Sequence, residues 1–230
     1  TPQYTQSDYY WYANTNDLTP SDAWPSGVID LDENDPISSG QAVMRNNVLR
    51  LRMSAMATTS IVSTSSATFK LQYGEGADCS LLTEWYDVGA LGSTTALWRG
   101  YNNSTTTATD GATIPSTLLT SATVRGSYEE ENNTASNPYA IPIGGIGEWD
   151  WVIENSAGVH GSTYCFRMVK SDGALFSDYT NYPTLVTNGS PEDITLYTPF
   201  DNEKLASTSP FFEFNAIDPE SNDISYQIQI

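Results

Sequence analysis

The sequence predicts an all-β protein built from antiparallel β-sandwiches, and three observations lead to that prediction. Apolar and polar residues alternate over many short runs, whereas no long stretch places apolar residues three and four positions apart as an amphipathic helix does. Clusters rich in Asn, Asp and Gly separate these runs at short intervals, as turns separate strands. The 14 Tyr and 6 Trp residues among 230 suit the pleated, half-buried surface of a sheet.

The clearest predicted strand covers residues 48–55. Leu49 and Leu51 are expected on its inward face and Arg50 and Arg52 on its outward face, because successive side chains of a strand point to opposite sides. Further strands are predicted over residues 9–12, 67–73, 85–88, 97–101, 124–130, 148–153, 162–170 and 184–187. In the strand over residues 67–73, Phe69, Leu71 and Tyr73 are expected on the inward face and the alternate residues on the outward face. Many short strands with regular turns predict a jelly-roll or an immunoglobulin/fibronectin-like sandwich.

A polar stretch containing Gly and Pro divides the chain. Residues 1–187 are expected to form a large β-sandwich domain and residues 188–192 a linker. The strand pattern resumes in residues 193–230, which we interpret as the first strands of an incomplete immunoglobulin/fibronectin-III-like module. Its predicted strands cover residues 194–199, 211–216 and 224–230.

Three strands are too few to bury both faces of a sandwich. We therefore expect either that this second module continues in a longer chain or that a neighbouring subunit adds a strand to it. Assembly by strand addition would use the alternating apolar residues Ile224, Tyr226, Ile228 and Ile230.

The charge balance excludes some partners. With 28 acidic and 9 basic residues the net charge is −19, so the chain lacks the basic face that a nucleic-acid partner requires. Anionic membrane surfaces are disfavoured for the same reason, and no apolar run is long enough to span a membrane. Strong acidity favours solubility and attracts divalent cations.

The two cysteines, Cys79 and Cys165, have two interpretations. In an oxidising compartment they would form a disulfide that ties an early strand to a late one and stabilises the fold by roughly 4 kcal/mol. The alternative is a pair of buried, reduced thiols. Their spacing matches no CxxC motif or metal site.

Calcium is the metal that the acidic loops favour, because this ion takes carboxylate and amide oxygens as ligands. Residues 218–223 resemble the acidic loop between strands of bacterial cadherin-like and fibronectin-like repeats, and residues 129–131 are three consecutive Glu. The candidate ligands are Asp218, Glu220, Asn222 and Asp223 in one loop and Asp30, Asp32 and Asn34 in another. The alternative for each loop is a solvated turn.

No set of residues predicts catalysis. Residues 148–154 are similar to the acidic strand of laminarinase-like jelly-roll glycosidases, but Glu148 and Glu154 are about 20 Å apart on a strand that rises about 3.3 Å per residue. A retaining pair of carboxyl groups needs a separation of about 5.5 Å. We therefore expect no enzymatic activity and assign Glu148 and Asp150 to a solvated face opposite a Trp-lined core.

Aromatic rings beside loops suggest sugar binding, since a ring face can stack on a pyranose. The candidates are Trp24, Trp98 and Tyr101, with core or hairpin packing as the alternative for each.

Seven segments together carry a resemblance: residues 10–14, 69–73, 85–89, 98–101, 128–132, 148–151 and 163–173. In this order they resemble a tandem β-module of very long secreted surface proteins from small-genome, uncultivated bacteria, over about residues 4–187. The tail resembles the start of a fibronectin-III- or cadherin-like repeat. The resemblance implies an extracellular setting and tandem modules, and it carries over no catalytic residues.

We therefore expect a non-enzymatic structural or adhesive protein of the bacterial cell surface, possessing one disulfide. It could be the subunit of a filament assembled by β-strand complementation. The alternative is a carbohydrate-binding module of a secreted multidomain protein. The expected partners are other copies of the chain or adjacent modules, and surface glycans.

Overall fold

The computed structural model describes residues 2–25, 31–38, 41, 43–103, 107–131, 135–188, 195–199, 204, 209, 211–218 and 224. Apart from the short 3-10 helix η2 (Cys79–Leu81), the elements of this part of the chain are strands. They are β1 (Tyr4–Ala13), β2 (Val48–Ala57), β3 (Thr68–Glu75), β4 (Tyr86–Asp87), β5 (Trp98–Gly100), β6 (Val124–Glu129), β7 (Ala135–Ser136), β8 (Ile146–Asn155), β9 (Thr163–Lys170), β10 (Asp178–Tyr179), β11 (Thr184–Val186), β12 (Thr195–Thr198) and β13 (Glu213–Asn215). The all-β prediction is confirmed.

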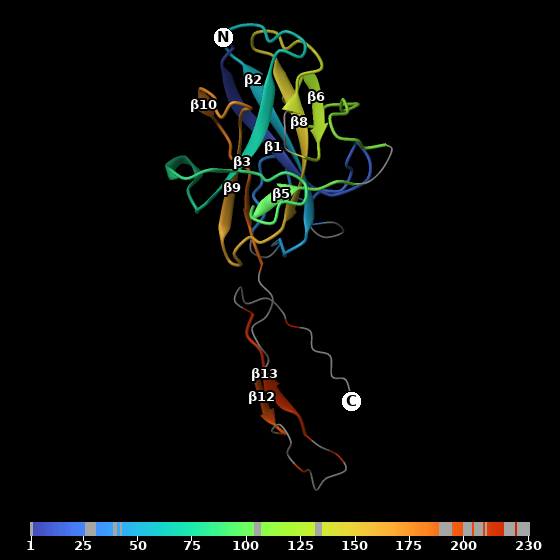
Figure 1. The fold of residues 1–230 in the computed structure, drawn as a ribbon, viewed down its shortest axis with the longest axis vertical. Coiled ribbons are helices and arrows are strands. Elements are labelled where there is room, and N and C mark those ends of the chain that lie inside the picture. The colour runs from blue at the N-terminus through green and yellow to red at the C-terminus, as the bar shows by residue number, and fades with distance from the viewer. Residues whose placement is uncertain are drawn as a thin grey trace.

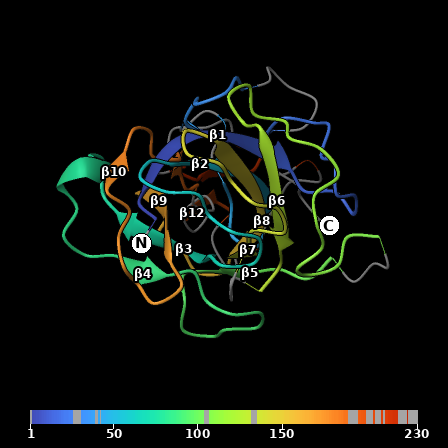
Figure 2. The same ribbon diagram turned by 90° about the horizontal axis from the view of Figure 1, so that it is seen from above.

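Two sheets pack face to face and form a β-sandwich (Figure 1). Sheet A has six strands in the order β10-β1-β2-β8-β5, with β6 also paired to β8; sheet B has five in the order β11-β9-β3-β4, with β7 paired to β3. The view from above separates β1 and β2 in one layer from β3 and β4 in the other (Figure 2). The pairings are antiparallel except for β1 with β10 and β6 with β8, which are parallel.

Aromatic rings fill the space between the two sheets. Trp11 of β1 meets Phe166 of β9 edge to face at 5.6 Å between ring centroids, and Trp149 of β8 meets Phe69 of β3 in the same way at 4.8 Å. Edge-to-face contact suits aromatic rings because the positive edge of one ring meets the negative face of the other. The inward faces predicted for residues 48–55, 67–73 and 148–153 are confirmed.

The pairing of β2 with β8 also brings charged residues together on the outer face of sheet A. Leu51 lies opposite Trp151 on the inward face, and Arg52 lies opposite Asp150 on the outer face. Because the side-chain period of a strand is two residues, this register aligns arginines with acids along the two central strands.

The predicted disulfide between Cys79 and Cys165 is present, with the two Cα atoms 5.6 Å apart. It joins η2 to β9, and β9 is the direct neighbour of β3 in sheet B. The disulfide therefore fastens the segment that follows β3 back onto the same sheet, and the alternative of two free thiols is wrong.

Two strands of the tail form a separate two-stranded sheet. Strand β12 pairs with β13 through Leu196 and Phe214, and this hairpin lies beyond one end of the sandwich (Figure 1). Ile224 is partly exposed, whereas the other predicted assembly residues, Tyr226, Ile228 and Ile230, lie outside the described residues. The boundary at 188–192 and the second module remain predictions.

In the described part of the chain, no helix has the length and apolar character needed to cross a bilayer.

Candidate functional site

The outer face of sheet A holds a buried ionic network. Arg50, Arg52, Glu148 and Asp150 each have 0% of their surface exposed. The expectation that Glu148 and Asp150 lie on a solvated face is therefore wrong, although they do lie opposite the tryptophans as predicted.

The four side chains of this sheet A network are close enough to neutralise one another. The Arg50 guanidinium meets both oxygens of Asp150, with Nε donating to Oδ1 at 3.0 Å. Arg52 lies between the two acids, with Nη1 at 2.6 Å from Glu148 Oε1 and Nε at 2.9 Å from Asp150 Oδ2. Two cations and two anions thus cancel, and their mutual attraction, together with further hydrogen bonds, offsets the cost of removing four charges from water.

The network also holds two loops over the sheet, which explains its burial. Arg50 Nη1 donates to the carbonyl oxygens of Thr15 and Asp17, at 3.0 and 2.7 Å, and Arg52 Nη2 donates to the carbonyl of Leu18 at 2.7 Å. These contacts attach the loop after β1 to sheet A.

The Glu148 carboxylate attaches the second loop. It accepts hydrogen bonds from the backbone N–H groups of Leu118 and Leu119, each at 2.9 Å to Oε2. Burial raises the pKa of Glu148, while the Arg52 guanidinium and these N–H donors oppose the rise. This carboxylate is a structural bridge and does not face solvent, where a substrate would be.

A small second core covers the rest of this face. Its buried members are Ala108, Ile114, Tyr128 and Val152. The Arg50 guanidinium also packs over the Tyr128 ring, with its central carbon 4.6 Å from the ring centroid.

Two residues of the run of three Glu at 129–131, Glu129 and Glu130, are buried at the end of β6 and form hydrogen bonds within the protein. Glu130 Oε1 accepts from the Asn103 N–H at 2.9 Å and from the Tyr128 hydroxyl at 2.8 Å. Glu129 is buried, and burial together with the nearby Asp110 charge raises its pKa to about 7.

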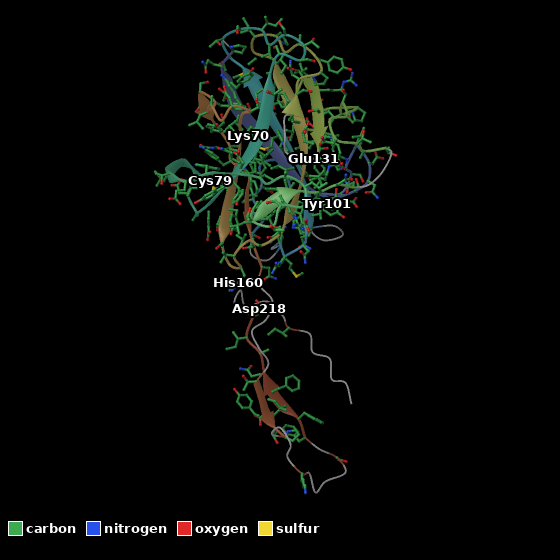
Figure 3. All side chains as sticks on the ribbon, viewed as in Figure 1. Lys70, Cys79, Tyr101, Glu131, His160 and Asp218 are labelled. Atoms are coloured by element: carbon green, nitrogen blue, oxygen red, sulfur yellow. A yellow bond between two sulfur atoms is a disulfide. The ribbon has the colours of Figure 1, made fainter. Side chains whose placement is uncertain are left out.

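The outer face of sheet B differs because polar and aromatic side chains remain partly open to solvent there. We define the sheet B face by Lys70, Gln72, Trp85, Asp87, Arg167, Tyr179 and Tyr182, all partly exposed except Asp87, which is exposed. Tyr179 comes from β10 at the edge of sheet A, and its hydroxyl donates to the Met168 carbonyl of β9 at 3.0 Å, which places it beside sheet B. In Figure 3 Lys70 and Cys79 mark this side of the sandwich, away from Tyr101 and Glu131. The sheet B face is the candidate functional site.

Three aromatic rings of this face lie nearly parallel. Tyr179 and Tyr182 stack with centroids 5.4 Å apart and planes 15° apart, and Tyr182 stacks with Trp85 at 5.9 Å and 27°. Arg167 completes the group, with its guanidinium carbon 4.1 Å from the centroid of Trp85.

A chain of polar contacts runs beside the rings. Lys70 Nζ lies 2.6 Å from Asp87 Oδ2, and Gln72 Nε2 donates to the other oxygen, Oδ1, at 2.8 Å. The side-chain oxygen of Gln72, Oε1, in turn accepts hydrogen bonds from Arg167 Nε and Nη2, at 3.1 and 2.9 Å. Each planar group is thereby held in one orientation by its neighbours.

Two features place Trp85 on this face. The Cys79–Cys165 disulfide anchors the start of the segment that carries it. The end of the same segment passes so close to β3 that a Cβ added at Gly74 would lie 2.9 Å from the Glu84 carbonyl oxygen and 3.4 Å from the Trp85 ring. A residue without a side chain at position 74 is therefore required for this approach.

The predicted calcium ligands are only partly described. Asp32 is exposed, and Asn34 is used structurally, since its amide accepts from the Tyr9 N–H at 3.1 Å and donates to Asp8 at 2.9 Å. Asp218 is buried, at 8% exposure. Glu220, Asn222, Asp223 and Asp30 lie outside the described residues.

Within the ranges that the structure describes, no group of three or more His, Cys, Asp or Glu side chains is placed to hold a metal ion. Calcium binding by the loops at 30–34 and 218–223 stays a prediction.

The predicted sugar-stacking residues are not brought together. Trp98 is completely buried, and its ring meets Tyr164 and Phe166 edge to face, so its assignment as a ligand contact is wrong. Trp24 is partly buried and donates through Nε1 to the carbonyl of Gln41 at 2.9 Å. Tyr101 packs beside the second core.

Sequence reasoning missed the sheet B face, although part of the signal was present. The alternation Phe69-Lys70-Leu71-Gln72 already assigned Lys70 and Gln72 to an outward face. The register that sets Gln72 opposite Arg167, and the stacking of Tyr182 on Trp85, involve long-range contacts that no local pattern encodes.

Comparison with known proteins found no matching family and no curated protein with significant sequence similarity to the chain.

Proposed function

We propose that this chain is a non-enzymatic domain of an extracellular surface protein, with a structural or adhesive role. The sheet A network supports this most strongly, because the two acids that offered the best enzymatic alternative have structural partners: Glu148 binds one loop, and Asp150 pairs with the arginines that bind another. The disulfide adds support, because such bonds persist mainly in oxidising compartments. The resemblance to tandem modules of long bacterial surface proteins points to the same setting.

The enzymatic alternative can be tested directly. The full chain is expected to release no reducing sugar from soluble β-glucan or xylan. Hydrolysis that is lost in Glu148→Gln, with an unchanged circular dichroism spectrum, would contradict the proposal.

The form of the structural role is tested by negative-stain electron microscopy of the full chain, with calcium and with a chelator. Regular filaments would support a polymer subunit that assembles through the strands of residues 193–230. Discrete particles would support an adhesive domain instead.

Carbohydrate binding is a second candidate function. It is favoured by the sheet B face, where aromatic rings and fixed hydrogen-bonding groups share one partly exposed surface.

A further inference from the structure

We infer that the sheet B face is a binding site for a neutral glycan built from pyranose rings, with Trp85, Tyr182, Gln72 and Asp87 as the contact residues. This inference rests on carbohydrate binding, the second candidate function, and goes beyond it by naming the surface and the chemical class of the ligand.

The aromatic part of the face matches the apolar side of a pyranose. A sugar ring presents C–H groups on its faces and hydroxyl groups around its rim, so it is recognised by aromatic rings together with a few polar groups. Trp85, Tyr179 and Tyr182 are partly exposed, and their contacts with one another and with Arg167 hold the rings in place. A ligand that packs on the exposed parts of these rings therefore needs to reorganise little of the surface.

The polar part supplies both donors and acceptors at fixed positions. The Gln72 amide is held by Asp87 on one side and by two donors of Arg167 on the other, so both lone pairs of its oxygen are used and its second Nε2–H is held in place as a donor. Asp87 is exposed and offers acceptor oxygens, while Arg167 offers N–H donors. Hydroxyl groups both donate and accept, so they match such a mixed row better than a carboxylate or an ammonium group would.

The charge of the face favours a neutral ligand. The cations Lys70 and Arg167 are balanced by Asp87, which pairs with Lys70, and by Asp178, which acts electrostatically on Tyr182. The whole chain carries a net charge of −19, so an anionic polysaccharide would be repelled at long range.

Affinity electrophoresis of the full chain tests the site, with soluble glucomannan, xyloglucan and mixed-linkage β-glucan as neutral probes and polygalacturonate as an anionic one. At least one neutral probe is expected to retard the wild type. Trp85→Ala and Tyr182→Ala are each expected to weaken that binding by about tenfold or more, as loss of a central aromatic contact does. Tyr139→Ala is the matched control: this exposed ring lies under Arg125, at 4.8 Å, outside the face, and its loss should leave affinity unchanged.

Tryptophan quenching locates the ligand without depending on an alanine variant that folds. Trp11, Trp98, Trp149 and Trp151 are at most 1% exposed, whereas Trp24 and Trp85 are partly exposed, so acrylamide reaches mainly the last two. A bound neutral polysaccharide should protect the wild type and Trp24→Phe from quenching, and should no longer protect Trp85→Phe.

The outcomes separate this site from the broader functions. Binding that survives both Trp85→Ala and Tyr182→Ala, or protection that is lost in Trp24→Phe, would overturn the site while leaving carbohydrate binding in place. If polygalacturonate is the one probe that retards the chain, the inference that the ligand is neutral is wrong. No retention by any neutral probe would overturn both the site and the second candidate function, and the microscopy would still test the structural role independently.

Discussion

The outer faces of the two sheets carry similar side chains that have different roles. Arg50 on sheet A and Arg167 on sheet B both lie over an aromatic ring, at 4.6 Å from Tyr128 and 4.1 Å from Trp85. Arg50 is fully buried and bonded to Asp150 and to loop carbonyls, whereas Arg167 is partly exposed and bonded to the neutral amide of Gln72. The comparison shows that what lies above a strand decides whether its outward side chains support the fold or remain accessible to a ligand.

The two faces also hold their covering segments by different means. Ion pairs and hydrogen bonds attach the loops of sheet A, through Arg50, Arg52 and Glu148. A covalent bond between Cys79 and Cys165 anchors the segment on sheet B. Four predictions test this contrast.

Breaking the sheet A network should cost the most stability. Asp150→Ala leaves Arg50 and Arg52 buried without their shared carboxylate, and should lower the free energy of unfolding by about 3 to 5 kcal/mol in urea denaturation. The matched control, Asp87→Ala, removes a carboxylate from an exposed ion pair and should cost below about 1 kcal/mol. Equal losses in the two variants would show that the contrast is wrong.

Removing the disulfide should have the next largest effect. The bond spans 86 residues of sequence, and the double variant Cys79→Ser with Cys165→Ser should lose about 2 to 4 kcal/mol of unfolding free energy. Because the segment that carries Trp85 is then less constrained, acrylamide quenching should increase as well. Unchanged quenching would mean that the close approach at Gly74 positions Trp85 without the disulfide.

Glu129, at the end of β6 in sheet A, should make the free energy of unfolding depend on pH. Its pKa rises from 4.5 to about 7 on folding, so its contribution is fully present below pH 4.5 and is lost as the pH increases through 7. Glu129→Gln should therefore be more stable than the wild type at pH 8, by on the order of 2 kcal/mol, and show no gain at pH 4.

Thermal unfolding from pH 4 to 8 measures this effect, with Glu131→Gln as a control of equal charge. If both variants show the same pH dependence, the effect comes from net charge and not from the burial of Glu129.

The same substitution on the two faces should have unequal effects. Arg167→Met removes a partly exposed cation–π contact and should lower the unfolding free energy by below about 1 kcal/mol. Arg50→Met leaves Asp150 buried without its bidentate partner and should cost about 3 kcal/mol or more. Urea denaturation of the two variants side by side measures the difference, and similar values would argue that sheet A tolerates the loss of a buried cation.

Local pattern alone predicted the strands and their inward faces. Alternation in residues 48–55 assigned Leu49 and Leu51 to the core, because the side-chain period of a strand is independent of its partners. The disulfide between Cys79 and Cys165 was also predictable, since a chain with two cysteines allows one pairing. The short strands β7 and β10 were missed because two residues carry too little periodicity to be recognised.

The role of the outward residues depended on tertiary structure. Two outward residues alternate on each of the central strands of sheet A: Arg50 and Arg52 on β2, and Glu148 and Asp150 on β8. The register of β2 against β8 decides whether these side chains meet. Loops distant in sequence decide whether water reaches them. By itself the sequence determined an all-β, disulfide-linked sandwich with a Trp-rich interior. Only tertiary structure decided that loops bury the polar face of sheet A completely, whereas the segments that carry Trp85 and Tyr182 cover the polar face of sheet B in part, because solvent access depends on long-range contacts.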